Sequence, residues 1–256
     1  MRAPDELRAL VEESLSELRL DPTLGALEEP IRYALGGGGK RIRPVLCLAV
    51  AEAAGTSAED ALPPATALEL VHTFSLVHDD LPALDDDDER RGRPSLHVAF
   101  GEAVALLAGD ALLAEALGLA ARCDPPEIAR ELARATLGMI GGQYLDVTGA
   151  QMQLEELHRL KTGRLFAAAV GLGLWAAGVP SEHQGPWRAF GEELGVLFQA
   201  VDDLLDGDGY SLELGADGAR RLAGDAAERA HERLGRIDAD TSVLAELVDG
   251  LAVRTA

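Results

Sequence analysis

The chain has 256 residues, of which 44 are acidic and 23 are basic, so its formal net charge is −21. A protein that binds a nucleic-acid duplex needs a concentrated basic surface, and this charge therefore excludes nucleic acid as the partner. Hydrophobic residues make up 47% and aromatic residues 4% of the chain, with alanine and leucine prominent throughout. Because both are strong helix formers that cover a pleated sheet poorly, the composition predicts an all-α fold.

The sequence also indicates a cytoplasmic protein without a membrane span. Cys47 and Cys123 are far apart and lack metal-ligand spacing, which is typical of reduced packing residues. Asp5 and Glu6 stand where a secretory signal would need apolar residues. The longest apolar run, 165–179, is shorter than the roughly 20 residues of a membrane-spanning helix, so we expect a buried core helix there.

Helical periodicity recurs along the whole chain, and no segment alternates with the period of a strand. A first amphipathic helix carries leucine and valine between Leu7 and Leu18. The glycine run 36–39 then precedes a helix near Pro44, which fits the first turn because its missing N–H needs no partner there. Helices are predicted over 45–54, 65–80, 102–121, 127–148, 154–178, 187–206, 218–235 and 241–252. No repeat or linker divides the chain, so we expect residues 1–256 to form a single domain.

The first informative segment is a run of acidic residues, seven within the eleven positions 79–89. Such charges repel one another unless cations hold them or water solvates them, and a solvated loop is the ordinary interpretation. That interpretation fits poorly here, because Asp79 and Asp80 directly end the apolar stretch 68–77, which should be buried. Pro82 ends the helix, so the chain can fold Asp85 back beside Asp79.

A second acidic group follows the apolar stretch 194–201 and consists of Asp202, Asp203 and Asp206. Positions four apart lie near one helix face, so Asp202 and Asp206 can point the same way. Both groups offer carboxylate oxygen without a His or Cys set at ligand spacing. Mg²⁺ prefers one or two carboxylates together with water and substrate phosphates. The sequence therefore predicts a site where metal ions bridge the protein to a phosphorylated substrate.

Such a substrate also needs basic partners, and the lysines are informative in this respect. The chain has only two lysines, Lys40 and Lys161, and each lies beside a glycine or a Thr-Gly pair. An ammonium on a flexible stem suits a point contact with phosphate and is not equivalent to a guanidinium fork. The candidates for phosphate contacts are Lys40, Arg43, Arg90, Arg91 and Lys161.

Six motifs follow one another along most of the chain: GGGKRIRP at 37–44, HTFSLVHDDLPALDDDDERRGRPSLH at 72–97, GEAVALLAGDAL at 101–112, GGQYLDV at 141–147, KTG at 161–163 and FQAVDDLLD at 198–206. In this order they resemble the trans-type (E)-prenyl diphosphate synthases, in particular the bacterial short-chain farnesyl and geranylgeranyl diphosphate synthases. A lone DDxxD motif is also found in terpene cyclases, whereas the ordered set is specific.

The resemblance implies an all-α helical bundle of the isoprenoid synthase type around a deep central cavity, usually as a homodimer. It implies head-to-tail joining of isopentenyl diphosphate to an allylic diphosphate, dimethylallyl or geranyl. Three Mg²⁺ ions would be bound by Asp79, Asp85 and Asp202, with support from Asp80, Asp203 and Asp206. Isopentenyl diphosphate would be held by Lys40, Arg43, His72 and Arg91, and the allylic diphosphate by Arg90 and Lys161. Thr162 and Gln199 would lie along the reacting carbons.

Among the histidines and the polar residues near the predicted site, His72 is expected to be functional and the others keep a structural interpretation. His72 lies two turns before Asp79 on the same helix face, which favours a functional role over that of an ordinary helix histidine. The structural set comprises His78, His97 and His158, together with Arg93 as a brace of the loop and Gln143 and Asp146 as hydrogen-bonding residues near the site. No side-chain base is expected, because the released diphosphate can take the proton.

Product length is expected to depend on Phe74, with its neighbour Ser75. Phe74 lies five residues before Asp79, about 7.5 Å further along the helix, where a phenyl ring would block a growing isoprenoid. In the bacterial proteins that the chain resembles, an aromatic residue there, combined with the Leu-Pro insertion between the aspartates, goes with a C15 product. Farnesyl diphosphate is therefore expected, and geranylgeranyl diphosphate is the alternative.

The chain departs from the resemblance after Asp206, where the family usually has lysines. No lysine follows Lys161, and the segment is short. Either Arg220 or Arg221 substitutes, or the phosphate site is more open, which weakens binding by roughly 1.5–3 kcal/mol. This gap leaves open a non-catalytic partner subunit of a heteromeric synthase, although its carboxylates should then be lost. A terpene cyclase would not need the Gly-Gly-Lys and Arg-Arg segments.

Overall fold

The computed structural model describes residues 1–149 and 153–253. Its helices are α1 (Pro4–Glu17), α2 (Glu28–Leu35), α3 (Ile42–Ala53), α4 (Ala58–Asp79), α5 (Leu96–Phe100), α6 (Glu102–Ala120), α7 (Glu127–Thr148), α8 (Leu154–His158), α9 (Arg164–Ala176), α10 (Gly185–Asp206), α11 (Gly209–Leu214), α12 (Ala216–Leu234) and α13 (Ser242–Ala252). Two-residue strands β1 (Glu89–Arg90) and β2 (Arg93–Pro94) pair antiparallel. The predicted all-α fold is confirmed.

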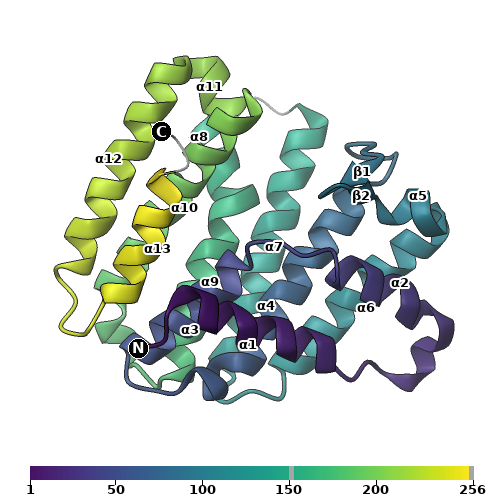
Figure 1. Ribbon diagram of the computed structural model, residues 1–256, viewed down its shortest axis with the longest axis horizontal. Helices are drawn as coiled ribbons and strands as arrows, with labels where there is room; N and C mark the ends of the chain where they lie inside the picture. The colour runs from purple at the N-terminus through teal and green to yellow at the C-terminus, as the bar shows by residue number, and fades with distance from the viewer. Residues whose placement is uncertain (150–152, 254–256) are drawn as a thin grey trace.

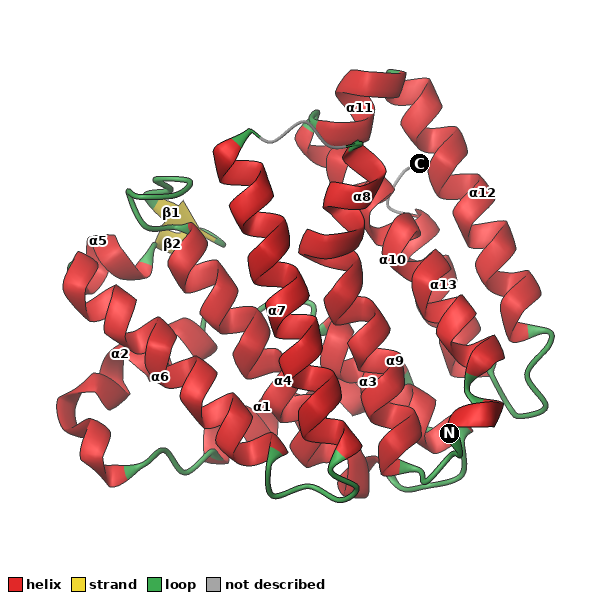
Figure 2. Cartoon of the chain, turned by 180° about the vertical axis from the view of Figure 1, so that it is seen from behind, coloured by secondary structure: helices red, strands yellow, loops and turns green. Residues whose placement is uncertain are grey.

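The long helices lie side by side, with α4 and α9 in the middle of the molecule (Figure 1). α4 packs against α3, α6 and α9, while α9 also contacts α7 and α10. On the far side, α12 and α13 cover α10, as the view from behind also shows (Figure 2). Both views place the β1–β2 pair and α11 at the same end of the molecule. Because these elements follow α4 and α10, the two acidic helix ends lie at one end of the bundle.

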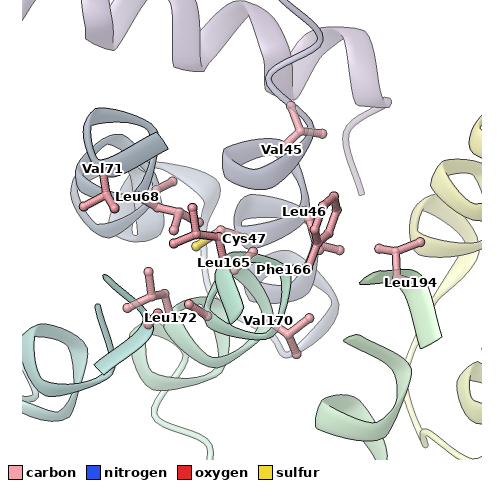
Figure 3. Packing of buried hydrophobic residues seen from close by; sticks show 14 of the residues in the cluster. Val45, Leu46, Cys47, Leu68, Val71, Leu165, Phe166, Val170, Leu172 and Leu194 are labelled. Carbon is pink, nitrogen blue, oxygen red and sulfur yellow. The ribbon is translucent and has the colours of Figure 1, made fainter. Parts of the chain in front are cut away.

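The core is built mainly from alanine, leucine and valine of the central helices. Leu46 and Cys47 of α3 pack with Leu68 of α4 and Phe166 of α9, and all four are fully buried (Figure 3). Burial also raises the pKa of the Cys47 thiol, so this cysteine stays protonated and acts as a packing residue. The core thus fixes the central helices that carry the acidic ends.

Helix boundaries differ from the prediction at two places that matter for the site. α4 begins at Ala58, because the hydroxyl of Ser57 accepts a hydrogen bond from the Asp60 amide at 3.1 Å and caps the helix before Pro63 and Pro64. The helix predicted over 154–178 is interrupted by a π-turn, Arg159–Gly163, between α8 and α9. The short helices α2, α5 and α11 were not predicted.

Among the residues that the structure describes, α6 alone is long and apolar enough to cross a membrane by length and composition. The sequence analysis did not identify α6 as such a helix, because it considered only uncharged runs and Asp110 and Glu115 interrupt α6. α6 packs closely against α4 and buries Ala105, Ala108, Gly109, Ala111, Leu112, Ala116 and Ala120. The apolar run 165–179 itself lies mostly in α9, where it is buried as expected.

Candidate active site

A cavity of about 1040 Å³ opens between the ends of the central helices. Its walls come from α3, α4, α6, α7, the π-turn, α9 and α10. The residues predicted for the site that line it are Lys40, Arg43, His72, Phe74, Ser75, Asp79, Arg90, Arg91, Lys161, Thr162 and Asp202. These residues come from four of the six motifs identified in the sequence, and Asp110 and Gln143, which also line the cavity, come from the other two.

The first acidic group presents Asp79 to this cavity at the end of α4. Burial raises the pKa of Asp79 to about 6, and the nearby Asp85 carboxylate adds to the rise, whereas Lys161 opposes it. The Asp85 amide donates a hydrogen bond to the Asp79 carbonyl at 2.9 Å, so the predicted fold-back after Pro82 is observed. Burial raises the pKa of Asp85 as well. A cation would relieve the unfavourable desolvation of both carboxylates.

The neighbouring Asp80 has a different environment. Its side chain is buried, and its Oδ1 atom accepts a hydrogen bond from Arg90 Nε at 2.7 Å and contacts Arg90 Nη2 at 2.5 Å. Asp80 is not among the residues that line the cavity, whereas Arg90 is. Its carboxylate thus orients a cation toward the site.

The second acidic group separates in a similar way. Asp202 lines the cavity, whereas Asp203 is only 3% exposed. The Asp203 Oδ1 atom accepts a hydrogen bond from Gln199 Nε2 at 2.6 Å, and Oδ2 accepts one from the Tyr210 amide at 2.8 Å. Asp203 therefore fastens α11 to α10, and Asp206 is exposed at the helix end.

Two residues near Asp203 are affected by this arrangement. Gln199 has its amide nitrogen on Asp203 and is not among the residues lining the cavity. His158 packs edge-on against the Tyr210 ring with its Nδ1 atom 3.7 Å from Asp203 Oδ2. Burial lowers the pKa of His158, while Asp203 opposes that effect. Both side chains belong to the packing that supports α11.

The basic side of the cavity is anchored by a buried ion pair. Arg41 adopts a left-handed backbone conformation, with φ of 48°, directly before α3. Its Nη1 atom lies 2.7 Å from Glu69 Oε1, and its Nε atom lies 2.8 Å from Glu12 Oε1. Arg41 and Glu69 are both buried, so the pair fixes the glycine-rich loop against α4. This positions Lys40 and Arg43 at the cavity wall.

Arg43 is the most unusual cation in the site. Its guanidinium lies over the rings of Phe166 and Phe198, at 4.8 and 5.3 Å from their centroids, and burial lowers its pKa to about 10. Its Nη1 atom is 3.2 Å from His72 Nε2, and its buried Nε atom has no hydrogen-bond partner among the described residues. Burial lowers the pKa of His72 well below its usual value, so the neutral ring accepts the hydrogen bond. A buried cation with an unsatisfied donor suits an anionic ligand.

The Arg-Arg segment meets the glycine-rich loop directly. Arg91 Nη1 donates a hydrogen bond to the Gly38 carbonyl. A Cβ atom at position 39 would lie 2.6 Å from the same nitrogen, and φ at Gly39 is +133°, so only glycine fits there. Arg93 stacks over the Tyr33 ring at 4.0 Å, which agrees with its expected role as a brace of the loop.

The opposite wall, formed by α7 and the π-turn, contains Gln143, which the sequence analysis ranked below the predicted ligands. Lys161 Nζ lies 2.6 Å from Asp146 Oδ2. Gln143, three residues before Asp146, lines the cavity, and both of its buried amide atoms lack a hydrogen-bond partner within the structure. An unsatisfied buried amide in a cavity wall is a ligand contact candidate. Gln143 and Asp146 are three residues apart and therefore share one helix face. This spacing within the motif at 141–147 was the signal that could have identified Gln143 as a cavity residue.

The carboxylates do not form a metal cage by themselves in the described part of the chain. Within 1–149 and 153–253, no three His, Cys, Asp or Glu side chains converge on one point. Asp79 and Asp202 both line the cavity, and this donor set fits Mg²⁺ ions shared with the phosphates of a ligand, rather than a cage made by protein alone.

The segment after α10 does not supply the missing lysine contact. Arg220 Nη1 pairs with Asp217 Oδ1 at 3.0 Å, and both side chains are largely exposed on α12. Neither Arg220 nor Arg221 is among the residues that line the cavity. Of the two alternatives raised by the sequence, the arrangement supports the more open phosphate site.

Comparison with known proteins agrees with this geometry. A family model described as polyprenyl synthetase matches residues 25–219. The chain is 43% identical to geranylgeranyl pyrophosphate synthase 7 of Arabidopsis thaliana, covering 78% of this chain but 62% of the relative. It is 39% identical to the farnesyl diphosphate synthase of Escherichia coli, covering 88% of each. The crystal structure of a geranyltranstransferase from Thermotoga maritima superposes with a TM-score of 0.86 at 31% identity, covering 98% of both chains.

Proposed function

The chain belongs to the polyprenyl synthetase family, and we propose that it condenses isopentenyl diphosphate with an allylic diphosphate, head to tail, in an Mg²⁺-dependent reaction. One observation carries this proposal: the carboxylates of Asp79 and Asp202 line the same cavity as the buried guanidinium of Arg43. Such a site can hold two diphosphates, one through metal ions and one through direct basic contacts.

On the acidic side, we assign Asp79, Asp85 and Asp202 to three Mg²⁺ ions on the allylic diphosphate. When bound, these ions neutralise the charge that develops on the departing diphosphate. We assign Lys161 and Arg90 to direct contacts with the same diphosphate. Asp146 holds Lys161 in place, and Asp80 holds Arg90. We assign Asp203 and Asp206 supporting roles, and Asp203 does so by holding α11 against α10.

On the basic side, Lys40, Arg43, His72 and Arg91 hold isopentenyl diphosphate. The carbon–oxygen bond of the allylic substrate breaks, and its electron pair leaves with diphosphate. The alkene of isopentenyl diphosphate then forms the new carbon–carbon bond, and the proton lost from it goes to the released diphosphate. We assign Thr162, which lines the cavity, to the reacting carbons, whereas Gln199 donates its amide to Asp203 and belongs to the packing that supports α11.

The apolar part of the cavity protects the allylic cation from water. Leu76, Leu113, Leu165 and Met139 contribute to its lining. Phe74, 6% exposed, and Ser75 border the same space on α4, which supports a C15 product, farnesyl diphosphate, with C20 as the alternative.

We further propose that the protein is a homodimer. Neighbouring helices α6 and α7 expose large apolar side chains, among them Leu107 at 55% and Leu137 at 70%. A second copy of the chain would cover such a surface. Sedimentation at micromolar concentration should give twice the mass of one chain, and a monomer at every concentration would contradict the proposal.

A non-catalytic partner subunit is the second candidate, favoured only by the missing lysine after α10. The deciding experiment incubates the purified protein with Mg²⁺, isopentenyl diphosphate and, separately, dimethylallyl, geranyl or farnesyl diphosphate, with EDTA as the control. We expect a C15 product that EDTA abolishes. A C20 product would keep the activity and overturn the assigned length. No product from a folded, metal-supplied protein would overturn the proposed activity and favour the partner subunit.

A further inference from the structure

The contact between α4 and α6 contains an unusually close approach. These helices pack side by side (Figures 1 and 2). The His78 ring of α4 lies directly over Gly109 of α6. A Cβ atom at position 109 would lie 2.1 Å from His78 Nε2 and 2.3 Å from its Cδ2. No side chain larger than hydrogen can occupy that position while the ring stays in place.

The histidine is held there by more than shape. Its Nε2 atom lies 3.0 Å from the Leu106 carbonyl, which can only accept a hydrogen bond, so Nε2 carries the proton. Asp110 Oδ1 is 3.9 Å from the same nitrogen. Gly109 leaves space for the His78 ring, and the Leu106 carbonyl accepts its hydrogen bond, so the ring has a defined orientation.

The orientation of the His78 ring affects the cavity because His78 contacts the Phe74 ring. The Phe74 ring lies one helical turn before His78, and the two ring centroids are 4.9 Å apart at 74°, an edge-to-face contact. Both side chains line the cavity, next to Asp110 and Leu113 of α6. If His78 moved, Phe74 would lose the neighbour that stops its ring from turning toward α6.

We infer that Gly109 and His78 are product-length-determining residues, which act by holding the Phe74 ring in the path of the growing isoprenoid. The inference rests on the proposed prenyl transfer and extends it. The Phe74 ring is the surface that the end of the growing isoprenoid meets. The His78 ring prevents the Phe74 ring from moving away, and the absence of a side chain at Gly109 makes room for His78. The sequence alone assigned His78 a structural role, but its ring is part of the cavity wall.

The test compares Gly109→Ala and His78→Ala with the wild type, using isopentenyl and geranyl diphosphates with Mg²⁺ and resolving the products by length. Gly224→Ala is the matched control, because Gly224 is also inside a helix and no atom of the described residues lies within 4 Å of its Cβ position. We expect both wall variants to raise the share of products at least one C5 unit longer than the wild-type product by roughly tenfold, the scale on which apolar pockets discriminate. Gly224→Ala should keep the wild-type distribution.

The double variant Gly109→Ala/His78→Ala tests the mechanism. If Gly109 acts through His78, the double variant should give the distribution of His78→Ala alone. Unchanged product lengths in the folded single variants, or an additive shift in the double variant, would overturn the inference. A wild type that makes no product would instead overturn the proposed function. Should Gly109→Ala fail to fold, His78→Ala against the wild type still decides the matter.

Discussion

The two acidic groups have a shared logic and one instructive difference. In each, the first aspartate lines the cavity and the second is buried, because consecutive helix positions point about 100° apart. Asp80 binds Arg90, a cation that itself lines the cavity, so burial there still serves the site. Asp203 binds Gln199 and the Tyr210 amide, so its burial serves the fold of α11. Adjacent carboxylates in one motif can therefore have separate roles, one chemical and one architectural.

The largest expected effect concerns the first aspartate of each group. Asp79→Ala and Asp202→Ala should each lower turnover by about 10²–10³-fold or more, because each removes a fixed charge that stabilises the transition state through metal ions. Steady-state kinetics with isopentenyl and geranyl diphosphates, alongside circular dichroism, checks this. A variant with near-normal rates would remove that carboxylate from the mechanism.

Asp203 should affect stability instead. Asp203→Ala leaves the buried Tyr210 amide and the Gln199 amide without their acceptor, which costs about 1–3 kcal/mol. For a chain of this size, thermal unfolding should shift down by roughly 2–4 °C per kcal/mol. The exposed Asp206→Ala is the matched control and should melt within about 0.5 kcal/mol of the wild type. Equal melting of both variants would refute the architectural role.

The raised pKa of Asp79 predicts a pH effect in metal-free protein. The folded state favours the protonated carboxyl, so the stability contributed by Asp79 is full below the usual value of 3.8 and is lost as pH rises through about 6. In EDTA, Asp79→Asn should therefore stabilise the protein by about 1–2 kcal/mol at pH 7.5, after discounting for partial exposure, and by little at pH 4. Urea unfolding at both pH values measures this, and a pH-independent difference would contradict it.

Gln143 should give the smallest effect. Its amide has no partner in the described structure, so Gln143→Leu should leave the unfolding temperature unchanged or raise it. If a substrate normally satisfies that amide, KM should rise by roughly tenfold. Unchanged KM for both substrates would show that Gln143 is only part of the wall.

The sequence predicted the helical fold, and most of the predicted site residues line the cavity, because helix periodicity and motif order are local signals. Helix spacing alone could not separate Asp202 from Asp203, which only the family resemblance ranked as ligand and support. Spacing shows that the two carboxylates diverge, but only the packing of Tyr210 and Gln199 shows which one is buried. The role that we infer for His78 could not be predicted for the same reason, since it depends on the absence of a side chain at Gly109, in a different helix.

The division of roles within the second acidic group can be tested by thermal unfolding of Asp202→Ala and Asp203→Ala in EDTA and in Mg²⁺ with inorganic diphosphate. We predict that Asp202→Ala loses less melting temperature in EDTA than Asp203→Ala does and gains nothing from Mg²⁺ and diphosphate. Asp203→Ala should melt lower in EDTA yet rise with Mg²⁺ and diphosphate, as the wild type does, because ligand binding stabilises the folded state. The reverse pattern, with Asp203→Ala stable but insensitive to the ligand, would contradict the assignment of Asp202 to metal-mediated diphosphate binding and of Asp203 to the fold.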